Sequence, residues 1–242
     1  MPADKAENGL KPRQASRWIM GAQQGIHKNL ESVVKKHFST QYKKPIADHT
    51  QRAFDGVKAE VLTHLKDNKP LIFDSCCGTA MSTAIIAQQN PDALVIGIDR
   101  SAVRLAKEYN DSLPKNARLV QAECADFWSL AKAEGWTLAK HYILYPNPYP
   151  KSKHLKRRWH GHPAFPLLFS LGGELSLRTN WQVYADEFCM AITLGQKIVS
   201  KKSKDALIPS DVKLIKPSQP LTLFEKKYQE GGQPLYECKI RL

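Results

Sequence analysis

The sequence has no apolar run approaching the roughly 20 residues that a helix needs to cross a bilayer. Its opening residues, MPADKAENGLKPRQ, contain no apolar stretch typical of a secretory signal. No C-x-x-C pair occurs, so neither a zinc ribbon nor a disulfide framework is expected. These absences favour a cytoplasmic protein in a reducing compartment, without a membrane partner. The five cysteines, an odd number, are Cys76, Cys77, Cys124, Cys189 and Cys238.

Catalytic signatures of several classes are also missing. No nucleophile elbow or triad accompanies the serines and cysteines. His154, His160 and His162 are spaced by six and two residues without an acidic or thiol partner nearby, so no metal site is predicted. The turn after the first apolar strand has a single glycine, Gly78, and is not the G-x-G-x-x-G of a pyrophosphate cradle.

Positive charge is what the sequence has in excess. Among 242 residues, 36 lysines and arginines stand against 23 acidic residues, giving a formal net charge of +13. Such a balance favours a polyanionic partner, nucleic acid first, although a merely basic surface would have the same composition. The length and the 42% hydrophobic content suit one α/β domain with a short N-terminal arm.

The chain divides into three regions by its pattern. Residues 1–17 are polar and are predicted to be disordered. Residues 18–66 are predicted to form a basic helical extension, because their apolar side chains recur at helical spacing. In residues 67–242 short apolar strands alternate with helices, which predicts an α/β fold with a doubly wound, Rossmann-like, mostly parallel sheet. Residues 212–217 and 235–242 are expected to be antiparallel edge strands, with no clear helix between them.

Acidic or amide residues follow the strands of this predicted sheet. Ligands of open α/β sheets bind beyond the carboxyl ends of the strands, so these residues are expected to gather at one site. Asp99 can accept hydrogen bonds from both ribose hydroxyls of a nucleoside, although it could instead cap the following helix. A nucleoside cofactor without a pyrophosphate cradle indicates S-adenosylmethionine rather than NAD. The strand-end residues are Asp74, Asp99, residues 123–126, Asn147 and Asn180.

Four motifs then make the pattern specific: GID at 97–99, PNPYPKSKHLKRR at 146–158, TNWQVYA at 179–185 and PLTLFE at 220–225. From about residue 70 onward the chain resembles the bacterial tRNA (guanine-N7)-methyltransferase family. The resemblance implies a class I S-adenosylmethionine-dependent methyltransferase domain over 67–242. It also implies methyl transfer to N7 of a tRNA guanine, in that family the variable-loop guanine, by a monomer or homodimer.

The resemblance assigns roles to individual positions. The catalytic position falls on Asn147. The cofactor positions fall on Asp74, Gly78, Asp99, Glu123, Cys124 and Asn147. The substrate positions fall on Lys151, Lys156, Arg157, Arg158, Asn180, Thr222, Leu223, Phe224 and Glu225.

Three positions depart from the family pattern. Asn147 and Asn180 stand where the family has aspartates, and Cys124 stands where it has an acidic cofactor contact. Guanine N7 carries a free lone pair, so its methylation needs no general base, and catalysis is expected to survive the change to amides. Two alternatives stay open. The chain could be an impaired relative that only binds tRNA or S-adenosylmethionine, or a methyltransferase with another nucleic-acid target, since N-P-Y-P loosely resembles the N-P-P-Y motif.

The proline-rich turn runs directly into a cationic stretch. Pro146 and Pro148 are expected to stiffen the end of the fourth strand and direct Asn147 into the cleft. Tyr149 is expected to pack against base or cofactor, and Trp159 to be available for stacking. The cations that follow are predicted to bind phosphate, the alternative being a solvated cationic turn. They are Lys151, Lys153, Lys156, Arg157 and Arg158.

Overall fold

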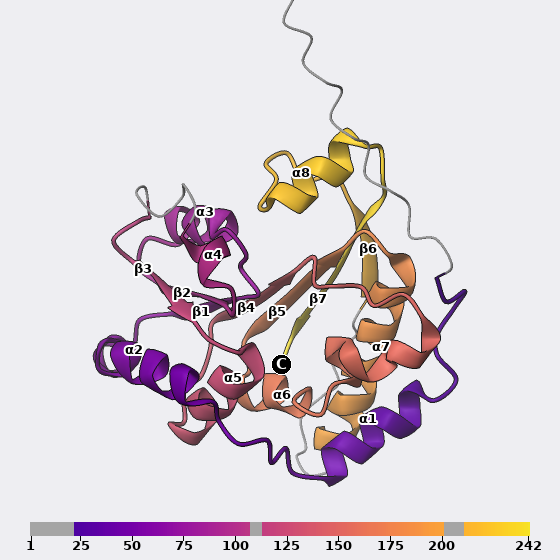
Figure 1. Cartoon of the computed structure of the whole chain (residues 1–242), viewed down its shortest axis with the longest axis horizontal. Coiled ribbons are helices and arrows are strands. Elements are labelled where there is room, and N and C mark those ends of the chain that lie inside the picture. The colour runs from indigo at the N-terminus through magenta and orange to yellow at the C-terminus, as the bar shows by residue number, and fades with distance from the viewer. Residues whose placement is uncertain (1–21, 107–112, 201–210) are drawn as a thin grey trace, which may run out of the picture.

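The computed structural model describes residues 22–106, 113–200 and 211–242, so the predicted disordered segment 1–17 lies outside the described part. A seven-stranded sheet in the order β3-β2-β1-β4-β5-β7-β6 forms the centre of the molecule (Figure 1). The strands are β1 (Leu71–Ser75), β2 (Leu94–Asp99), β3 (Ala117–Gln121), β4 (Lys140–Leu144), β5 (Glu174–Thr179), β6 (Asp211–Ile215) and β7 (Leu235–Arg241).

The first five strands are parallel, and β7 runs antiparallel between β5 and β6. Every residue of β1 and β2 is buried. Strands covered on both faces read as continuous apolar runs rather than as alternating patterns, and this is why the sequence identified them. The predicted doubly wound, mostly parallel sheet with antiparallel C-terminal strands is confirmed.

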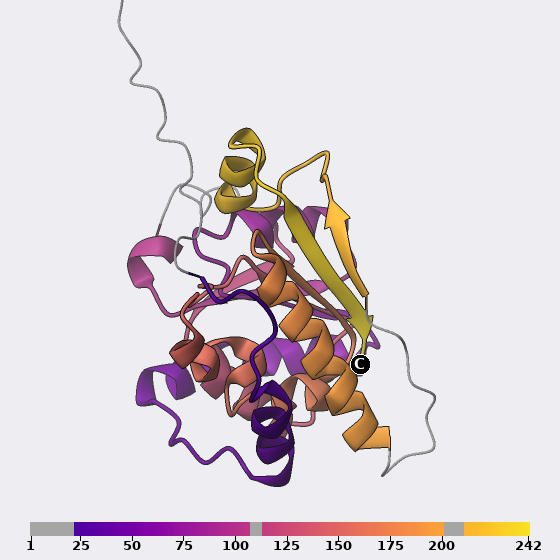
Figure 2. The ribbon, with the colours of Figure 1, turned by 90° about the vertical axis from the view of Figure 1, so that its right-hand side faces the viewer.

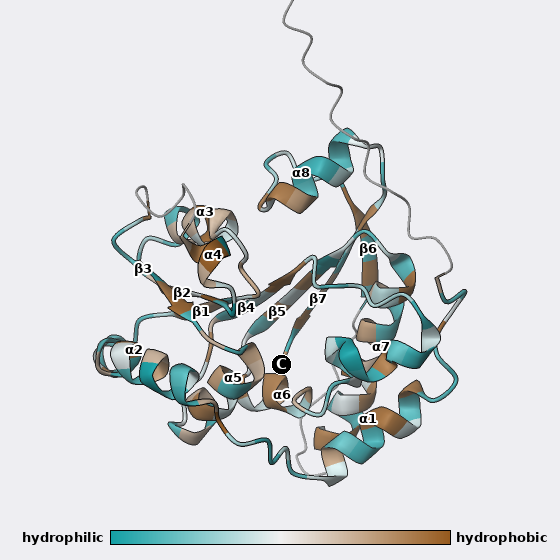
Figure 3. Cartoon of the chain, in the orientation of Figure 1, coloured by the Kyte–Doolittle hydropathy of each residue, from teal (hydrophilic) through white to brown (hydrophobic). Residues whose placement is uncertain are grey.

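Helices cover the sheet unequally. The larger core holds apolar side chains of α1, α2, α5, α6 and α7 against the strands. The smaller core packs Ile86 and Ala87 of α3 against Ile72, Val95 and Ala117. In Figure 3 the ribbons of α2 and α7 alternate between hydrophilic and hydrophobic stretches, as amphipathic helices do. The helices are α1 (Leu30–Ser39), α2 (Asp48–Lys66), α3 (Met81–Gln89), α4 (Ala102–Leu105), α5 (Cys124–Ala133), α6 (Pro166–Leu171), α7 (Gln182–Ser200) and α8 (Leu223–Glu230).

The helices near the N-terminus pack into the larger core. Leu30 and Val34 of α1, with Phe54 and Val61 of α2, are almost completely buried there. Phe54 stacks on Trp136 at a centroid distance of 4.6 Å, and α1 lies against α7 (Figures 1 and 2). The described part of the predicted extension contains the two helices α1 and α2, and both share their apolar core with the sheet.

The structure corrects the expectation that no helix separates the last two strands, because α8 lies between β6 and β7. Thr222 caps it by accepting a hydrogen bond from the Glu225 amide at 2.9 Å, and the Glu225 carboxylate accepts one from the Leu221 amide. A Thr-x-x-Glu spacing is a helix-start pattern. The sequence therefore contained this signal, which was interpreted only as a substrate segment.

The structure also corrects the cysteine prediction in one respect. Cys189 of α7 and Cys238 of β7 form a disulfide across 49 residues of sequence. Cys76, Cys77 and Cys124 are free thiols. No described helix is long and apolar enough to span a membrane.

Candidate functional site

The loop after β1 has an unusual backbone. Cys76, Gly78 and Ala80 have φ angles of 63°, 62° and 64°. L-residues rarely adopt this left-handed conformation, whereas glycine adopts it freely. The loop therefore follows the path of a glycine-rich turn with two of three glycine positions occupied by other residues. The sequence analysis missed this, although the alternation of small residues at 76, 78 and 80 could have indicated it.

Asp99 holds this loop in place. Its carboxylate accepts hydrogen bonds from the Gly78 amide at 3.0 Å and the Ser101 amide at 2.8 Å, and it pairs with Arg104 at 2.9 Å. Asp99 itself is buried, while the Arg104 side chain is 45% exposed. The alternative role of Asp99 as a helix cap is taken by Ser101, whose hydroxyl accepts a hydrogen bond from the Arg104 amide at the start of α4. Asp99 thus lies at the predicted edge of the sheet, next to the loop that a cofactor would contact.

Asp74 is a completely buried carboxylate below the same loop. Its Oδ2 atom accepts hydrogen bonds from the hydroxyls of Ser82 and Thr83 at 2.6 and 2.7 Å. Its Oδ1 atom has no hydrogen-bond partner among the described residues. Burial raises the pKa of Asp74 to about 6, against the two hydroxyl hydrogen bonds that lower it.

The end of β3 supplies the next predicted residues. Asp126 is buried and accepts hydrogen bonds from Lys44 Nζ at 3.0 Å and from the Ala47 amide at 3.1 Å. It therefore fastens the segment between α1 and α2, and its carboxylate is occupied by these two contacts. Glu123 occupies the N-cap position of α5 and is half-buried. Cys124 is buried, with its Sγ atom 3.7 Å from that of Cys76.

The proline turn presents Asn147 to solvent. Tyr145 and Tyr149 have φ angles of 50° and 44° on either side of it. Asn147 is exposed, and its Oδ1 atom accepts a hydrogen bond from the Tyr149 amide at 3.3 Å. The Arg157 guanidinium lies 5.8 Å from the centre of the Tyr149 ring. The turn therefore holds Asn147 exposed at the carboxyl end of β4, and its predicted orientation into the cleft stays a prediction.

The cationic stretch forms two short 3-10 helices, η2 (Ser152–Arg157) and η3 (Trp159–Gly161). Lys151, Lys156 and Arg157 are exposed, as a phosphate-binding role requires. Arg158 is completely buried, so its predicted contact with phosphate is wrong. Trp159 is half-buried and packs on Trp128 at 4.5 Å, and its predicted stacking role stays a prediction.

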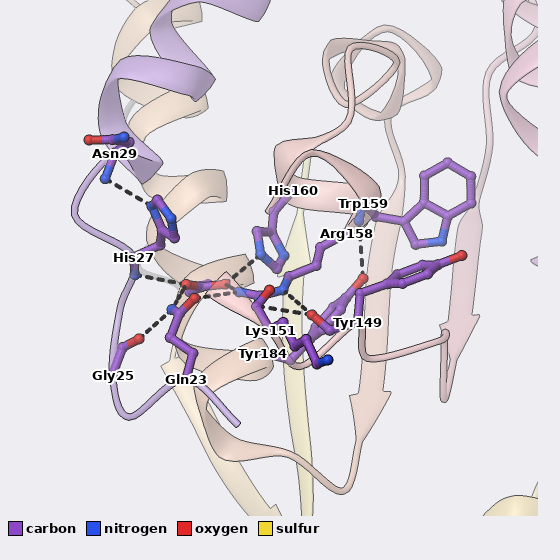
Figure 4. A network of polar contacts seen from close by, with 11 residues as sticks. Gln23, Gly25, His27, Asn29, Tyr149, Lys151, Arg158, Trp159, His160 and Tyr184 are labelled. Carbon is purple, nitrogen blue, oxygen red and sulfur yellow. Dashed lines mark hydrogen bonds and ion pairs between the residues drawn. The ribbon is translucent and has the colours of Figure 1, made fainter. Parts of the chain in front are cut away.

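Arg158 instead holds the backbone of the proline turn in place. Its Nη2 atom donates to the carbonyl oxygens of Tyr149 and Lys151 at 3.0 and 3.3 Å, and its Nη1 atom pairs with Glu187 of α7 at 2.6 Å (Figure 4). The guanidinium also lies 4.8 Å from the centre of the Trp181 ring. The second arginine of the cationic stretch therefore positions the turn that carries Asn147.

Glu187 is the centre of this buried network. Besides Arg158, it accepts hydrogen bonds from Gln23 Nε2 at 2.6 Å, the His27 amide at 2.8 Å and His160 Nε2 at 2.8 Å. Burial opposes its ionisation, but the hydrogen bond from His160 and the charge of Arg158 outweigh burial and lower its pKa to about 2. One carboxylate thus joins residues 22–29, the proline turn and α7. No sequence motif indicated this role for Glu187.

The remaining predicted residues lie around the start of α8. Asn180 is half-buried and donates to Gln233 at 2.7 Å. Glu225 is completely buried, where it accepts from the Tyr145 hydroxyl at 2.9 Å and pairs with Arg178 at 3.0 Å. Its predicted contact with substrate is therefore wrong, and it links α8 to the proline turn instead.

Leu223 and Phe224, between the capping residues of α8, are 48% and 54% exposed. They are large apolar side chains open to solvent beside the predicted site. No cluster of three or more potential metal ligands occurs among the residues that the structure describes.

Comparison with known proteins agrees with this geometry. The family described as "Putative methyltransferase" matches residues 68–238. The tRNA (guanine-N(7)-)-methyltransferase of Treponema pallidum (strain Nichols) is 29% identical over 174 residues, which are 69% of this chain and 65% of that protein. The enzyme of the same name from Zymomonas mobilis is 29% identical over 181 residues, covering 72% of this chain and 76% of that one. The chain thus spans less than two thirds of the Treponema relative.

Two solved structures share the fold. One is an antibiotic-related methyltransferase, with a TM-score of 0.54 and 12% identity over 76% of this chain and 94% of that chain. The other is the 16S rRNA methyltransferase KamB, with a TM-score of 0.51 and 13% identity over 84% and 96% of the two chains. At this level of identity the similarity establishes a class I methyltransferase fold.

Proposed function

Because the chain belongs to the methyltransferase family that matches residues 68–238, we propose that it transfers a methyl group from S-adenosylmethionine to N7 of a guanine in tRNA. The proposal rests on the position of three features at one edge of the sheet. The exposed Asn147 turn, the loop after β1 and the exposed cations of η2 all follow the carboxyl ends of parallel strands. In doubly wound sheets ligands bind at this edge.

The loop after β1 suits a nucleoside cofactor. Three of its residues have left-handed backbone, and a Cβ atom built on Gly78 would meet nothing within 4 Å, so the chain is open to a ligand at this glycine. Gly78, Asp99, Glu123, Cys124 and Asn147 are the residues proposed to hold S-adenosylmethionine, which supplies an electrophilic methyl group when bound. The completely buried Asp74 is proposed to support the loop from below through Ser82 and Thr83. For Asp99 to accept ribose hydroxyls, the exposed Arg104 side chain would have to move aside.

The chain's own contribution to the reaction is positioning. Guanine N7 has a free lone pair in the major-groove edge, so no residue has to remove a proton. Asn147 can accept a hydrogen bond from a guanine N–H through its amide oxygen. Arg158 and Glu187 hold the backbone of its turn. Holding the methyl group in line with guanine N7 lowers the activation barrier of the transfer, because the reactants are already oriented.

Neutral Asn147 does not offset the positive charge that the purine gains on methylation. The missing electrostatic contact is expected to cost about 1–3 kcal/mol of transition-state stabilisation relative to an aspartate. Lys151, Lys156 and Arg157 are proposed to bind tRNA phosphates, with Asn180, Thr222, Leu223 and Phe224 near the target base. Action on tRNA favours a cytoplasmic protein, and the family resemblance favours a monomer or homodimer.

The test is methyl transfer from labelled S-adenosylmethionine to unmodified tRNA, followed by mass analysis of the nucleosides. We expect N7-methylguanosine. Cofactor binding without any transfer would instead support the second candidate, an impaired relative that only binds. The amides Asn147 and Asn180 favour that candidate, and the variant Asn147→Asp separates the two. Activity that appears only in the variant would indicate lost catalysis, whereas an active parent would be accelerated by about 5- to 150-fold, the equivalent of about 1–3 kcal/mol.

A further inference from the structure

Two free thiols lie close together at the carboxyl edge of the sheet, and the contact between them has no role in the proposed methyl transfer. Cys76 follows β1 and Cys124 begins α5 after β3, and their Sγ atoms are 3.7 Å apart. Between the two strands lies β2, and Cys124 Sγ also approaches the carbonyl oxygen of Ile98 at 3.8 Å. The thiol pair therefore crosses the end of β2, next to Asp99.

We infer that Cys76 and Cys124 form a site of reversible oxidation, at which a peroxide converts the two thiols into a disulfide that closes the cofactor site. Only the closure of the cofactor site rests on the proposed function. The formation of the disulfide depends on the two thiols alone. Sulfur atoms 3.7 Å apart need to approach by less than 2 Å to reach a disulfide bond length of about 2.05 Å.

The chemistry is balanced with a peroxide as oxidant. The sulfur of Cys76, the half-exposed member of the pair, attacks a peroxide oxygen. The O–O bond breaks, one water molecule leaves and Cys76 becomes a sulfenic acid. The buried Cys124 sulfur then displaces the hydroxyl group from Cys76 and loses its proton, which leaves with that hydroxyl group as a second water. Two electrons pass from the thiols to the peroxide, and a dithiol reverses the change.

The environment of the pair assigns these roles. Cys124 is buried, and its hydrogen bond with Cys76 together with burial raises its thiol pKa well above the usual range. It is thus the poorer first nucleophile and the natural resolving partner. Cys77 is buried, and its pKa is also raised, chiefly by burial. Of the three free thiols only Cys76 is partly open to solvent.

Closure of the cofactor site follows from the loop geometry. Cys76 lies two residues before Gly78, whose amide is bonded to Asp99. A disulfide would draw this loop toward α5 and take Cys124 from the position where the family resemblance places a cofactor contact. We therefore expect the dissociation constant for S-adenosylhomocysteine to rise at least ten-fold on oxidation and to recover with dithiothreitol.

The experiment compares the full chain reduced, treated with hydrogen peroxide, and treated and then reduced again. Peptide mapping under non-reducing conditions identifies the linkage, and calorimetry with S-adenosylhomocysteine measures binding. Because Cys76 and Cys77 share one peptide, the variants Cys76→Gly and Cys77→Ser assign the sulfur. The link to the Cys124 peptide should vanish in Cys76→Gly and persist in the Cys77→Ser control.

Absence of the 76–124 link, or its survival in Cys76→Gly, would overturn the inference. A link that forms while binding stays unchanged would equally overturn the claim of closure. If the reduced protein binds no S-adenosylhomocysteine, the proposed function and closure both fail, while the peptide map still decides whether the thiols are an oxidation site. The Cys189–Cys238 disulfide appears in other peptides and serves as an internal control.

Discussion

The network around Glu187 and the loop after β1 are built in opposite ways. Four residues donate hydrogen bonds to the buried Glu187 carboxylate. One of them, Arg158, also donates to the carbonyl oxygen of Tyr149. In the loop, Asp74 Oδ1 has no partner among the described residues, and Cys76 is held in a left-handed conformation. The several hydrogen bonds of Glu187 and Arg158 fix a single geometry, although the buried Nδ1 atom of His160 in this network has no partner among the described residues. Backbone strain, which the loop combines with its unpaired atom, is typical of sites where ligands bind.

The difference shows how the protein divides its tasks. The Glu187 network stabilises the position of the proline turn before any ligand arrives. The loop after β1 carries a cost of about 1–2 kcal/mol for each non-glycine residue in the left-handed region. It therefore contributes less to stability than its burial suggests. Removing a strained side chain from the loop should raise stability, whereas removing a partner from the Glu187 network should lower it.

The largest expected effect is on the Glu187 network. The variant Arg158→Met leaves a buried carboxylate without its cation, which typically costs about 3–5 kcal/mol. Urea unfolding at pH 7 would measure the loss in the free energy of unfolding. The matched control is Arg157→Met at the exposed neighbouring position, which should lose less than about 1 kcal/mol and yet weaken tRNA binding and its salt dependence.

The double variant Arg158→Met/Glu187→Met sharpens the comparison. If the penalty comes from an uncompensated charge, removing both partners should restore part of the stability lost in the single variant. Equal stabilities for Arg157→Met and Arg158→Met would contradict the assignment of Arg158 to a buried brace.

The next effect concerns Asp74 and depends on pH. Its folded pKa of about 6 lies above its ordinary value of 3.8. The folded state therefore holds this proton more tightly, and the contribution of Asp74 to stability falls as pH rises from about 4 to 6. Over two pKa units this amounts to about 3 kcal/mol. The variant Asp74→Asn should be the more stable protein at pH 8 by up to this amount.

The measurement is the difference in free energy of unfolding between Asp74→Asn and the parent at pH 5 and pH 8. A difference that grows with pH supports the account. The exposed carboxylate of Asp92 provides the control, because Asp92→Asn should stay within about 0.5 kcal/mol of the parent at both pH values. If the difference in free energy of unfolding between Asp74→Asn and the parent were the same at both pH values, the raised pKa of the buried Asp74 carboxylate would be refuted.

The smallest effects test the backbone of the loop. Cys76→Gly relieves a left-handed side chain and should raise stability by about 1 kcal/mol. Gly78→Ala at φ 62° should lower it by about the same amount. A Cβ atom at residue 78 meets nothing within 4 Å, so strain alone is measured. Thermal unfolding of the reduced proteins checks both changes, and the same sign for both would rule out strain as the cause.

Much of the fold could be predicted from local sequence. Parallel strands buried on both faces leave continuous apolar runs, so β1 and β2 were identifiable residue by residue. The helix α8 was also encoded, by Thr222 and Glu225 at capping spacing. It was missed because the same four residues were assigned to substrate binding. A family motif can thus include residues whose role is to start a helix.

The site was predicted less completely. Asn147, Lys151 and Arg157 are exposed as a binding role requires, whereas Arg158 and Glu225 are buried. Adjacent arginines have the same local chemistry, and only the approach of Glu187 from α7 decides which of them faces inward. Likewise, no spacing in the sequence brings Cys76 within 3.7 Å of Cys124.

The sequence by itself therefore determined the alternation of strands and helices, the strand ends that gather at one edge, and the excess of positive charge, because each depends on near neighbours in the chain. Only the tertiary structure decided which charges are buried, which thiols meet and where the backbone is strained. These depend on contacts between residues far apart in sequence, whose partners no local pattern specifies.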